Sequence, residues 1–131
     1  MRTRPLSFAE RRDWLRLYRT RTVGPVAFWA LLERYGDAGA ALSALPGLIR
    51  KKGIAPPTSD QVEAEMEASE RMGVRLLCAV EPDYPDLLRA VEPVPPLLSV
   101  WGDLSLTARP CVAIVGSRNA SAVGMRFAAQ L

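Results

Sequence analysis

The sequence predicts an α/β protein in which a small all-helical N-terminal part precedes the start of a parallel sheet. In the first half of the chain, apolar residues recur at helical spacing between turns that contain glycine or proline. From Val74 onward, short runs of valine, leucine and isoleucine replace that pattern. One run, Cys111–Val115, is apolar throughout, as expected for a central strand covered on both faces.

The first helix is predicted by a capping box. In Ser7–Glu10 the Ser7 hydroxyl can accept from the Glu10 backbone N–H while the Glu10 carboxylate returns the contact. The helix is expected to run to about Arg21. Trp14 lies on its apolar side and is predicted to be a core residue.

Further short helices follow at tight turns. Residues 22–25, Thr-Val-Gly-Pro, end the first helix, and Pro25 suits the first turn of the second, which Gly36 closes. Trp29 and Tyr35 are expected in its core face. A third helix is predicted over 37–42, and residues 46–53, which begin Pro-Gly, break the pattern again.

The arrangement of helices around residues 22–25 resembles helix-hairpin-helix and SAM-like modules, whose turn amides can face a DNA phosphate. Packed helices also need glycine and proline in tight turns for steric reasons alone. Both interpretations remain open at this point.

The second half of the chain begins after a proline-rich linker. A helix capped by Thr58 or Ser59 is predicted over 58–72, with strands over 74–80, 97–101 and 111–115. We therefore expect three parts, which are a helical domain (1–56), a connecting helix (57–73) and the N-terminal part of a sheet domain (74–131). A doubly wound sheet needs about 100 or more residues, so this last domain is expected to be truncated.

Composition limits the chemistry that the chain can perform. Its 131 residues include no histidine, which removes the commonest general base and metal ligand. Cys78 and Cys111 show no metal-like spacing and are expected to be buried, reduced thiols. No apolar run could span a bilayer. Any enzymatic chemistry would have to use carboxylates or residues outside this stretch. We expect a cytoplasmic protein without metal, cofactor or membrane partner.

Charge is unevenly distributed along the chain. Residues 1–21 hold seven arginines against two acidic residues, a local excess of +5, while residues 58–73 hold five acidic residues against one arginine. The basic and acidic helices could pack against each other or present two solvated faces. The alternative is that the basic helix contacts nucleic acid.

The segment after residues 111–115 is the candidate binding site. Gly116 permits close approach of a ligand to the backbone, and the free amides of the next helix attract an anion. Ser117 and Ser121 can donate hydroxyl hydrogen bonds, Ser121 or Asn119 can cap the helix, and Arg118 offers a planar charged fork. Dinucleotide and P-loop glycine patterns are absent, so the loop favours another phosphate ligand. A turn built only for packing is the alternative.

An ordered set of motifs then extends over about 40 residues. It comprises Tyr84-Pro85-x-x-Leu88, Pro95-Pro96-x-Leu98, Gly102, and Val112-Ala-Ile-Val-Gly-Ser-Arg118 with Ser121 and Gly124. This set resembles the opening of the Rossmann-like domain of the DNA-processing protein A (DprA/Smf) family. The prolines are expected to fix chain direction. Trp101 is expected to be a core or rim residue rather than a base-stacking platform.

The resemblance implies a SAM-like N-terminal domain and single-stranded-DNA binding through Gly116, Ser117 and Arg118, and through Asn119, Ser121 and Gly124. It also implies protection of incoming DNA in natural transformation, loading of the RecA recombinase, and a homodimer. We therefore expect a non-enzymatic protein without catalytic residues. Val123 replaces the aromatic residue that many members place before the glycine. The alternative function is a Rossmann-like nucleotide phosphoribohydrolase of the lysine-decarboxylase-like group, which would need a later P-G-G-x-G-T segment.

Overall fold

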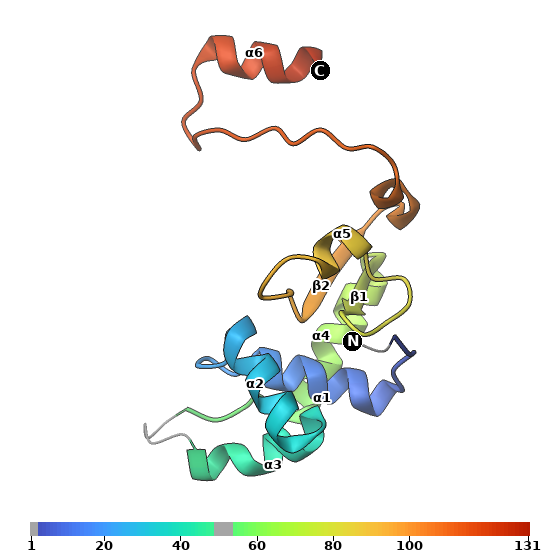
Figure 1. The fold of residues 1–131 in the computed structure, drawn as a ribbon, viewed down its shortest axis with the longest axis vertical. Coiled ribbons are helices and arrows are strands. Elements are labelled where there is room, and N and C mark those ends of the chain that lie inside the picture. Colours follow the sequence, from blue (N-terminus) through green and yellow to red (C-terminus); the bar gives the residue numbers. More distant parts are fainter. Residues whose placement is uncertain (1–2, 49–53) are drawn as a thin grey trace.

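The computed structural model describes residues 3–48 and 54–131, and within them helices form most of the first half of the chain (Figure 1). Three helices precede residues 49–53. A fourth helix leads into the first strand, and a one-turn helix separates that strand from the second. The elements are α1 (Phe8–Tyr18), α2 (Pro25–Tyr35), α3 (Ala38–Leu48), α4 (Ser59–Arg71), β1 (Val74–Cys78), α5 (Asp86–Arg89), β2 (Leu97–Trp101), the 3₁₀ helix η1 (Leu104–Ala108) and α6 (Ala122–Gln130). No helix among the described residues is long and apolar enough to cross a membrane.

The predicted helix starts are confirmed where a side chain caps the backbone. Ser7 and Glu10 form the capping box of α1, in which the Ser7 N–H donates to the Glu10 carboxylate at 2.9 Å. Thr58 and Gln61 form the same arrangement at the start of α4. Each box satisfies backbone N–H groups that the helix itself leaves free, so these boundaries are determined locally.

Two helix ends differ from the prediction. Helix α1 ends at Tyr18 rather than near Arg21, and residues 19–24 form the turn to α2. Helix α3 runs to Leu48 with Pro46 inside it, although Pro46 was expected to break the chain. Pro46 lies in the last described turn of α3, where its missing N–H removes one hydrogen bond of the helix. The rest of the predicted break, 49–53, lies outside the described residues.

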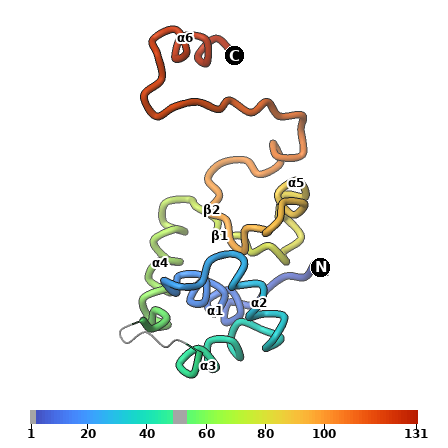
Figure 2. Tube along the Cα trace, turned by 60° about the vertical axis from the view of Figure 1, so that its left-hand side comes forward, coloured from blue at the N-terminus to red at the C-terminus, as the bar shows by residue number. Residues whose placement is uncertain are grey.

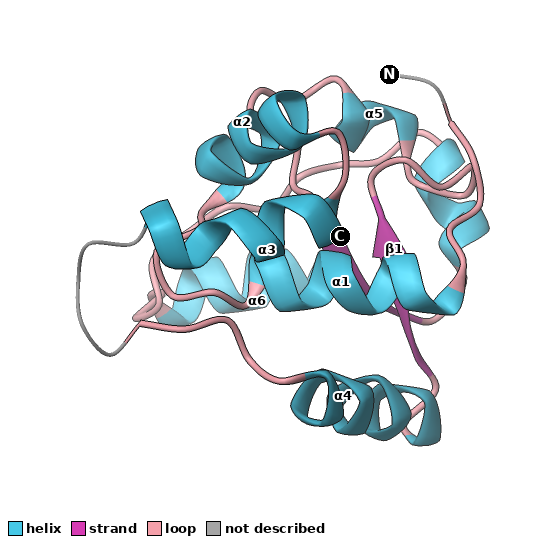
Figure 3. Cartoon of the chain, turned by 90° about the horizontal axis from the view of Figure 1, so that it is seen from below, coloured by secondary structure: helices cyan, strands magenta, loops and turns pink. Residues whose placement is uncertain are grey.

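Helix α2 begins and ends as predicted. Pro25 occupies its first turn, and Gly36 follows it with a φ of 88°, in the left-handed half of the backbone map where only glycine is unstrained. Figure 3 shows α3 next to α1, with α4 below them in this view; α4 contacts both α1 and β1.

The strands form a two-stranded antiparallel sheet, which corrects the expected parallel arrangement. Val74 pairs with Trp101 and Cys78 with Leu97, in one continuous register. The intervening residues 79–96 contain only the one-turn helix α5, so the chain turns back without the longer helical crossover that a parallel pair requires. The N-terminal part is all-helical as predicted, and the whole is a mixed α/β chain.

The third predicted strand is not formed. Residues 111–115 are extended and exposed, with Val112 and Val115 at 85% and 91% accessibility. Figures 1 and 2 show this segment leading away from the helices toward α6. A strand needs a neighbour for its N–H and C=O groups, and β1 and β2 pair with each other at a distance from this segment.

One hydrophobic core joins the N-terminal helices to the sheet. Trp14 and Phe28 meet edge to face at 4.9 Å between ring centroids, and Phe28 meets Trp29 in the same way at 5.5 Å. The core also takes in residues of α4, the sheet and the turn that follows β1, which are Val62, Leu77, Cys78, Ala79, Tyr84 and Leu97. Tyr35 is partly buried and packs against this core.

Two side chains expected inside are on the surface. Trp101 is 82% exposed at the end of β2, which corrects its assignment to the core or rim. Cys78 is buried as predicted, but Cys111 is exposed because it belongs to the extended segment rather than to a strand.

Candidate nucleic-acid interface

Of the residues that the sequence singled out, Gly116, Ser117, Arg118 and Asn119 lie in the loop before α6, Ser121 is at its N-terminus, and Gly124 lies in its first turn. The Ser117 hydroxyl oxygen accepts from the Asn119 backbone N–H at 3.1 Å, which closes a small turn around Arg118. Ser121 is the residue that caps α6, and its hydroxyl oxygen accepts from the Gly124 backbone N–H at 3.2 Å. The choice between Asn119 and Ser121 as the cap is thereby resolved.

All six candidate residues are exposed (residues 116–119, 121 and 124). A Cβ atom placed on Gly116 would have no neighbour within 4 Å, so no packed group restricts access to this stretch of backbone. Among the ion pairs of the described residues, none includes Arg118. The loop therefore offers an unpaired guanidinium next to a helix N-terminus.

The basic helix α1 has a different role from the loop. Arg19 contacts Glu65 of α4 at 2.7 Å, and Arg12 contacts Glu63 at 3.2 Å. Arg16 donates to the Pro57 carbonyl oxygen at 3.0 Å. Part of the charge pattern thus reflects complementary packing of α1 and its C-cap residue Arg19 against α4 and the segment before it.

A further arginine of α1 reaches the turn after β1. Arg11 forms an ion pair with Glu81, whose side chain is only 7% exposed. The second carboxylate oxygen of Glu81 accepts from the Cys78 backbone N–H at 2.8 Å. Sequence reasoning did not find this pair, because the two residues are 70 positions apart and neither belongs to a motif.

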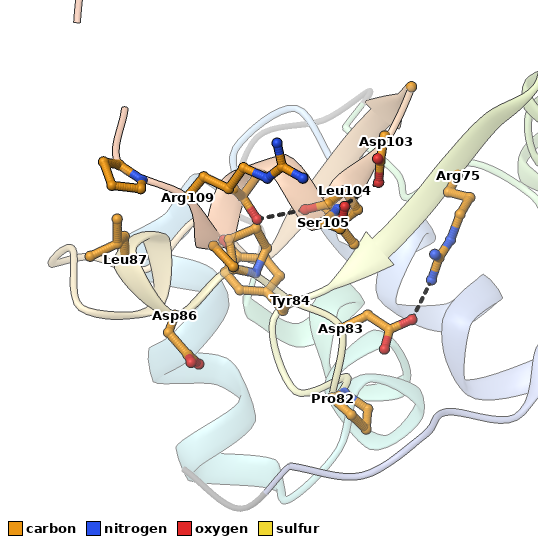
Figure 4. Close-up of a pocket in the computed structure, with 15 residues that line it drawn as sticks. Arg75, Pro82, Asp83, Tyr84, Asp86, Leu87, Asp103, Leu104, Ser105 and Arg109 are labelled. Carbon is orange, nitrogen blue, oxygen red and sulfur yellow. Dashed lines mark hydrogen bonds and ion pairs between the residues drawn. The ribbon is translucent and has the colours of Figure 1, made fainter. Parts of the chain in front are cut away.

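An open cavity of about 910 Å³ lies between α5 and η1 (Figure 4). Its charged groups are largely engaged with one another or with the backbone. Arg75 contacts Asp83 at 2.7 Å, and Asp103 accepts from the Ser105 N–H at 2.9 Å. Hydrogen bonds from Ser105 lower the pKa of Asp103. Arg109 stands at the rim, at the start of the segment that leads toward the loop.

No group of three or more acidic, cysteine or histidine side chains suited to a metal occurs within residues 3–48 and 54–131. The polar groups next to Arg118 are backbone amides and serine hydroxyls. Such donors, together with a guanidinium, hydrogen-bond to phosphate oxygens.

Two family models together match most of the chain. A model described as "DprA-like N-terminal HHH domain" matches residues 8–68, and one described as "DNA recombination-mediator protein A" matches residues 75–131. The chain belongs to the DprA family. No curated protein matches it.

In the DprA-family chain, the two matches meet near the boundary between α4 and β1. The first model ends within α4 and the second begins within β1, so the helical part and the motif set fall in matches to one family. The family is described as a mediator of DNA recombination, which assigns the chain to DNA processing. The segment with Gly116, Ser117 and Arg118 falls inside the mediator match.

Proposed function

We propose that the protein acts in DNA recombination by binding single-stranded DNA through the loop that contains Gly116, Ser117, Arg118, Asn119 and Ser121, and through Gly124 in the first turn of α6. Arg118 would contact a backbone phosphate, with amides of the loop and of the first turn of α6 donating to the same or the next phosphate. Binding of this kind positions the strand and does not depend on base sequence.

The observation that carries this proposal is the charge of the C-terminal segment. Residues 104–131 contain three arginines and no aspartate or glutamate. No ion pair within the described residues involves Arg109, Arg118 or Arg126. In α1, by contrast, arginines are paired with carboxylates of α4 and of the β1 turn. The segment therefore offers positive charge to a polyanion without first having to break internal pairs.

The biological role that we propose follows from the family. The protein would protect incoming single strands in the cytoplasm during natural transformation and help to load the RecA recombinase onto them. It would do so as a homodimer and by binding alone, without catalysing a reaction. The part in DNA recombination rests on the mediator description of the family. Protection of incoming strands, RecA loading, the homodimer and the cytoplasmic location rest on the resemblance of the motif set to the DprA/Smf family.

The test is equilibrium binding of fluorescein-labelled oligo-dT to the full-length protein, measured by fluorescence anisotropy at several salt concentrations. Arg118→Ala should weaken binding about fivefold to tenfold at low salt. It should also reduce the slope of log affinity against log salt concentration by about the contribution of one phosphate contact. The matched control is Arg71→Ala, since Arg71 is an exposed arginine of α4 whose side chain is 70% accessible.

The control separates a specific contact from a change in net charge, because both variants lose one positive charge. Equal affinity and equal salt slope for Arg118→Ala and Arg71→Ala would show that the loop is not the binding site. Circular dichroism of each variant verifies that the fold is retained.

A further inference from the structure

A groove separate from the C-terminal segment lies between α2 and the chain after α5. Its volume is about 740 Å³. One wall is a face of α2 whose residues recur at helical spacing: Val26, Trp29, Ala30 and Glu33. Residues 89–94 form the other wall, and Figure 2 shows these two segments side by side.

The two walls are fixed to each other. The Trp29 indole N–H donates to the Val94 carbonyl oxygen at 2.7 Å, across 65 positions of the sequence. The Trp29 ring also packs edge to face against Trp14, at 5.7 Å between centroids. The groove is therefore held open by the core of the protein and needs no rearrangement to accept a ligand.

The floor of the groove is apolar and accessible. Val26 is 70% exposed and lies on α2, in which Phe28 is the buried residue. Ala30 is also exposed, while Pro93 and Val94 contribute apolar surface from the opposite wall. An apolar side chain laid along this floor would remove that surface from water.

The charges around the groove determine what it can bind. Glu33 and Glu92 stand on opposite walls, and neither belongs to an ion pair of the described residues. Arg89 also lines the groove, but its terminal nitrogens donate inward to the carbonyl oxygens of Ala79, Glu81 and Tyr84. The accessible charge is thus negative on both sides, which repels DNA phosphates and attracts cationic side chains.

We propose that this groove is a docking site for a segment of a partner protein that carries a large apolar side chain flanked by lysine or arginine. The apolar side chain would lie on the floor formed by Val26, Trp29 and Ala30, and the flanking cations would pair with Glu33 and Glu92. The site is separate from the Arg118 loop, so a protein partner and a DNA strand can be bound at the same time.

The test uses the full-length protein and an acetylated, amidated peptide of alternating leucine and arginine, with the leucine–glutamate peptide for comparison. Binding is followed by the NMR signal of the Trp29 indole N–H, which is assigned from the spectrum of Trp29→Phe, and by calorimetry. The leucine–arginine peptide should shift that signal and bind more tightly than the leucine–glutamate peptide.

Two variants locate the peptide. Glu33→Gln with Glu92→Gln should weaken binding about threefold to tenfold at low salt, whereas Glu67→Gln with Glu70→Gln on α4 should leave it unchanged. Ala30→Gln should also weaken binding, because it fills the floor from an exposed helical position without changing charge.

Unchanged affinity in both the Glu33/Glu92 and the Ala30 variants would overturn the proposal, as would equal binding of the two peptides. Sedimentation gives a further outcome. If the wild type is a dimer and the Glu33/Glu92 variant a monomer, the occupant is a second copy of this chain and not a partner protein.

Discussion

The guanidinium of Arg89 lies over the ring of Tyr84, 5.4 Å from its centroid, and also donates to the Tyr84 carbonyl oxygen at 2.9 Å. The same guanidinium donates to the carbonyl oxygen of Ala79 at 2.8 Å. The Tyr84 hydroxyl in turn donates to the Pro95 carbonyl oxygen at 2.8 Å. Arg89 and Tyr84 therefore hold together both ends of the connection between β1 and β2.

Arg89→Lys should destabilise the protein by about 2–3 kcal/mol, because an ammonium cannot reach all the carbonyl oxygens that the guanidinium fork satisfies. Urea denaturation followed by circular dichroism measures this change. Arg71→Lys, at a 70% exposed side chain, should change stability by less than about 0.5 kcal/mol. A similar small effect at Arg89 would show that the connection is held by other contacts.

Phe28→Ala should cost about 3–5 kcal/mol of stability, since Phe28 is fully buried and loses its edge-to-face contacts with Trp14 and Trp29. Trp101→Ala removes a larger ring that is 82% exposed, and it should cost less than about 0.5 kcal/mol. Thermal unfolding of the two variants checks the contrast. A large loss at Trp101 would mean that another part of the protein covers this ring.

Local chemistry accounts for the parts of the fold that sequence could predict. Capping boxes, Pro25 and Gly36 act within one helix turn, and they define the starts of α1 and α4 and both ends of α2. The relative direction of β1 and β2 could not be predicted in this way, because the same apolar runs can pair parallel or antiparallel. The strand expected over 111–115 failed because pairing needs a neighbour that no local pattern supplies.

The local geometry of the candidate loop was predictable for the same reason, whereas its binding of DNA stays a prediction. The loop residues and the cap of α6 follow one another in sequence, and Ser121 performs the capping that its residue type suggests. For the arginines of α1 and its C-cap, the sequence showed only that residues 1–21 are basic and residues 58–73 acidic, and not which side chains pair. Assigning Arg19 to Glu65 needs the helix packing, which places residues 46 positions apart in contact.

Arg4 controls the titration of Glu10. The pKa of Glu10 is lowered from 4.5 to about 2, chiefly by the hydrogen bond from Arg4 and then by those from Ser7. Arg4→Ala should therefore raise the pKa of Glu10 toward its ordinary value, as measured by carbon-detected NMR titration. Ser7→Ala should give a smaller rise.

The hydrogen bond from Arg4 to Glu10 should also make the free energy of unfolding decrease as the pH falls. Because the pKa of Glu10 is lower in the folded state, its stabilising effect is complete above about pH 4.5 and is lost as pH falls toward 2. The difference in melting temperature between the wild type and Glu10→Gln should accordingly narrow over that range. A difference that stays constant from pH 7 to pH 2 would contradict the assignment.

The two cysteines should react differently. Burial raises the pKa of the Cys78 thiol to about 12, so almost no thiolate is present at pH 8, and the side chain is also inaccessible. Cys111 is exposed. Iodoacetamide should label Cys111 alone in the folded protein and both cysteines in urea, as read by mass spectrometry. Labelling of Cys78 without denaturant, tested in Cys111→Ser, would refute this.

The pair between Arg19 and Glu65 should show coupling in a double-mutant cycle. Both side chains are partly exposed, so the coupling energy of Arg19→Ala and Glu65→Ala should be about 0.3–1 kcal/mol. Arg19→Ala should leave oligo-dT affinity unchanged, in contrast to Arg118→Ala. A comparable loss of affinity in both variants would show that α1 also contacts DNA.

The single core that joins the N-terminal helices to the sheet has an evolutionary consequence. Leu77 and Leu97 of the sheet belong to the same buried cluster as Trp14 and Phe28, so each part supplies the other with its interior surface. Exchange of the helices for those of an unrelated protein would leave the sheet side uncovered and open to aggregation. A change of side-chain volume on one side of this core should therefore select for a compensating change on the other side, because each side fills the space that the other leaves.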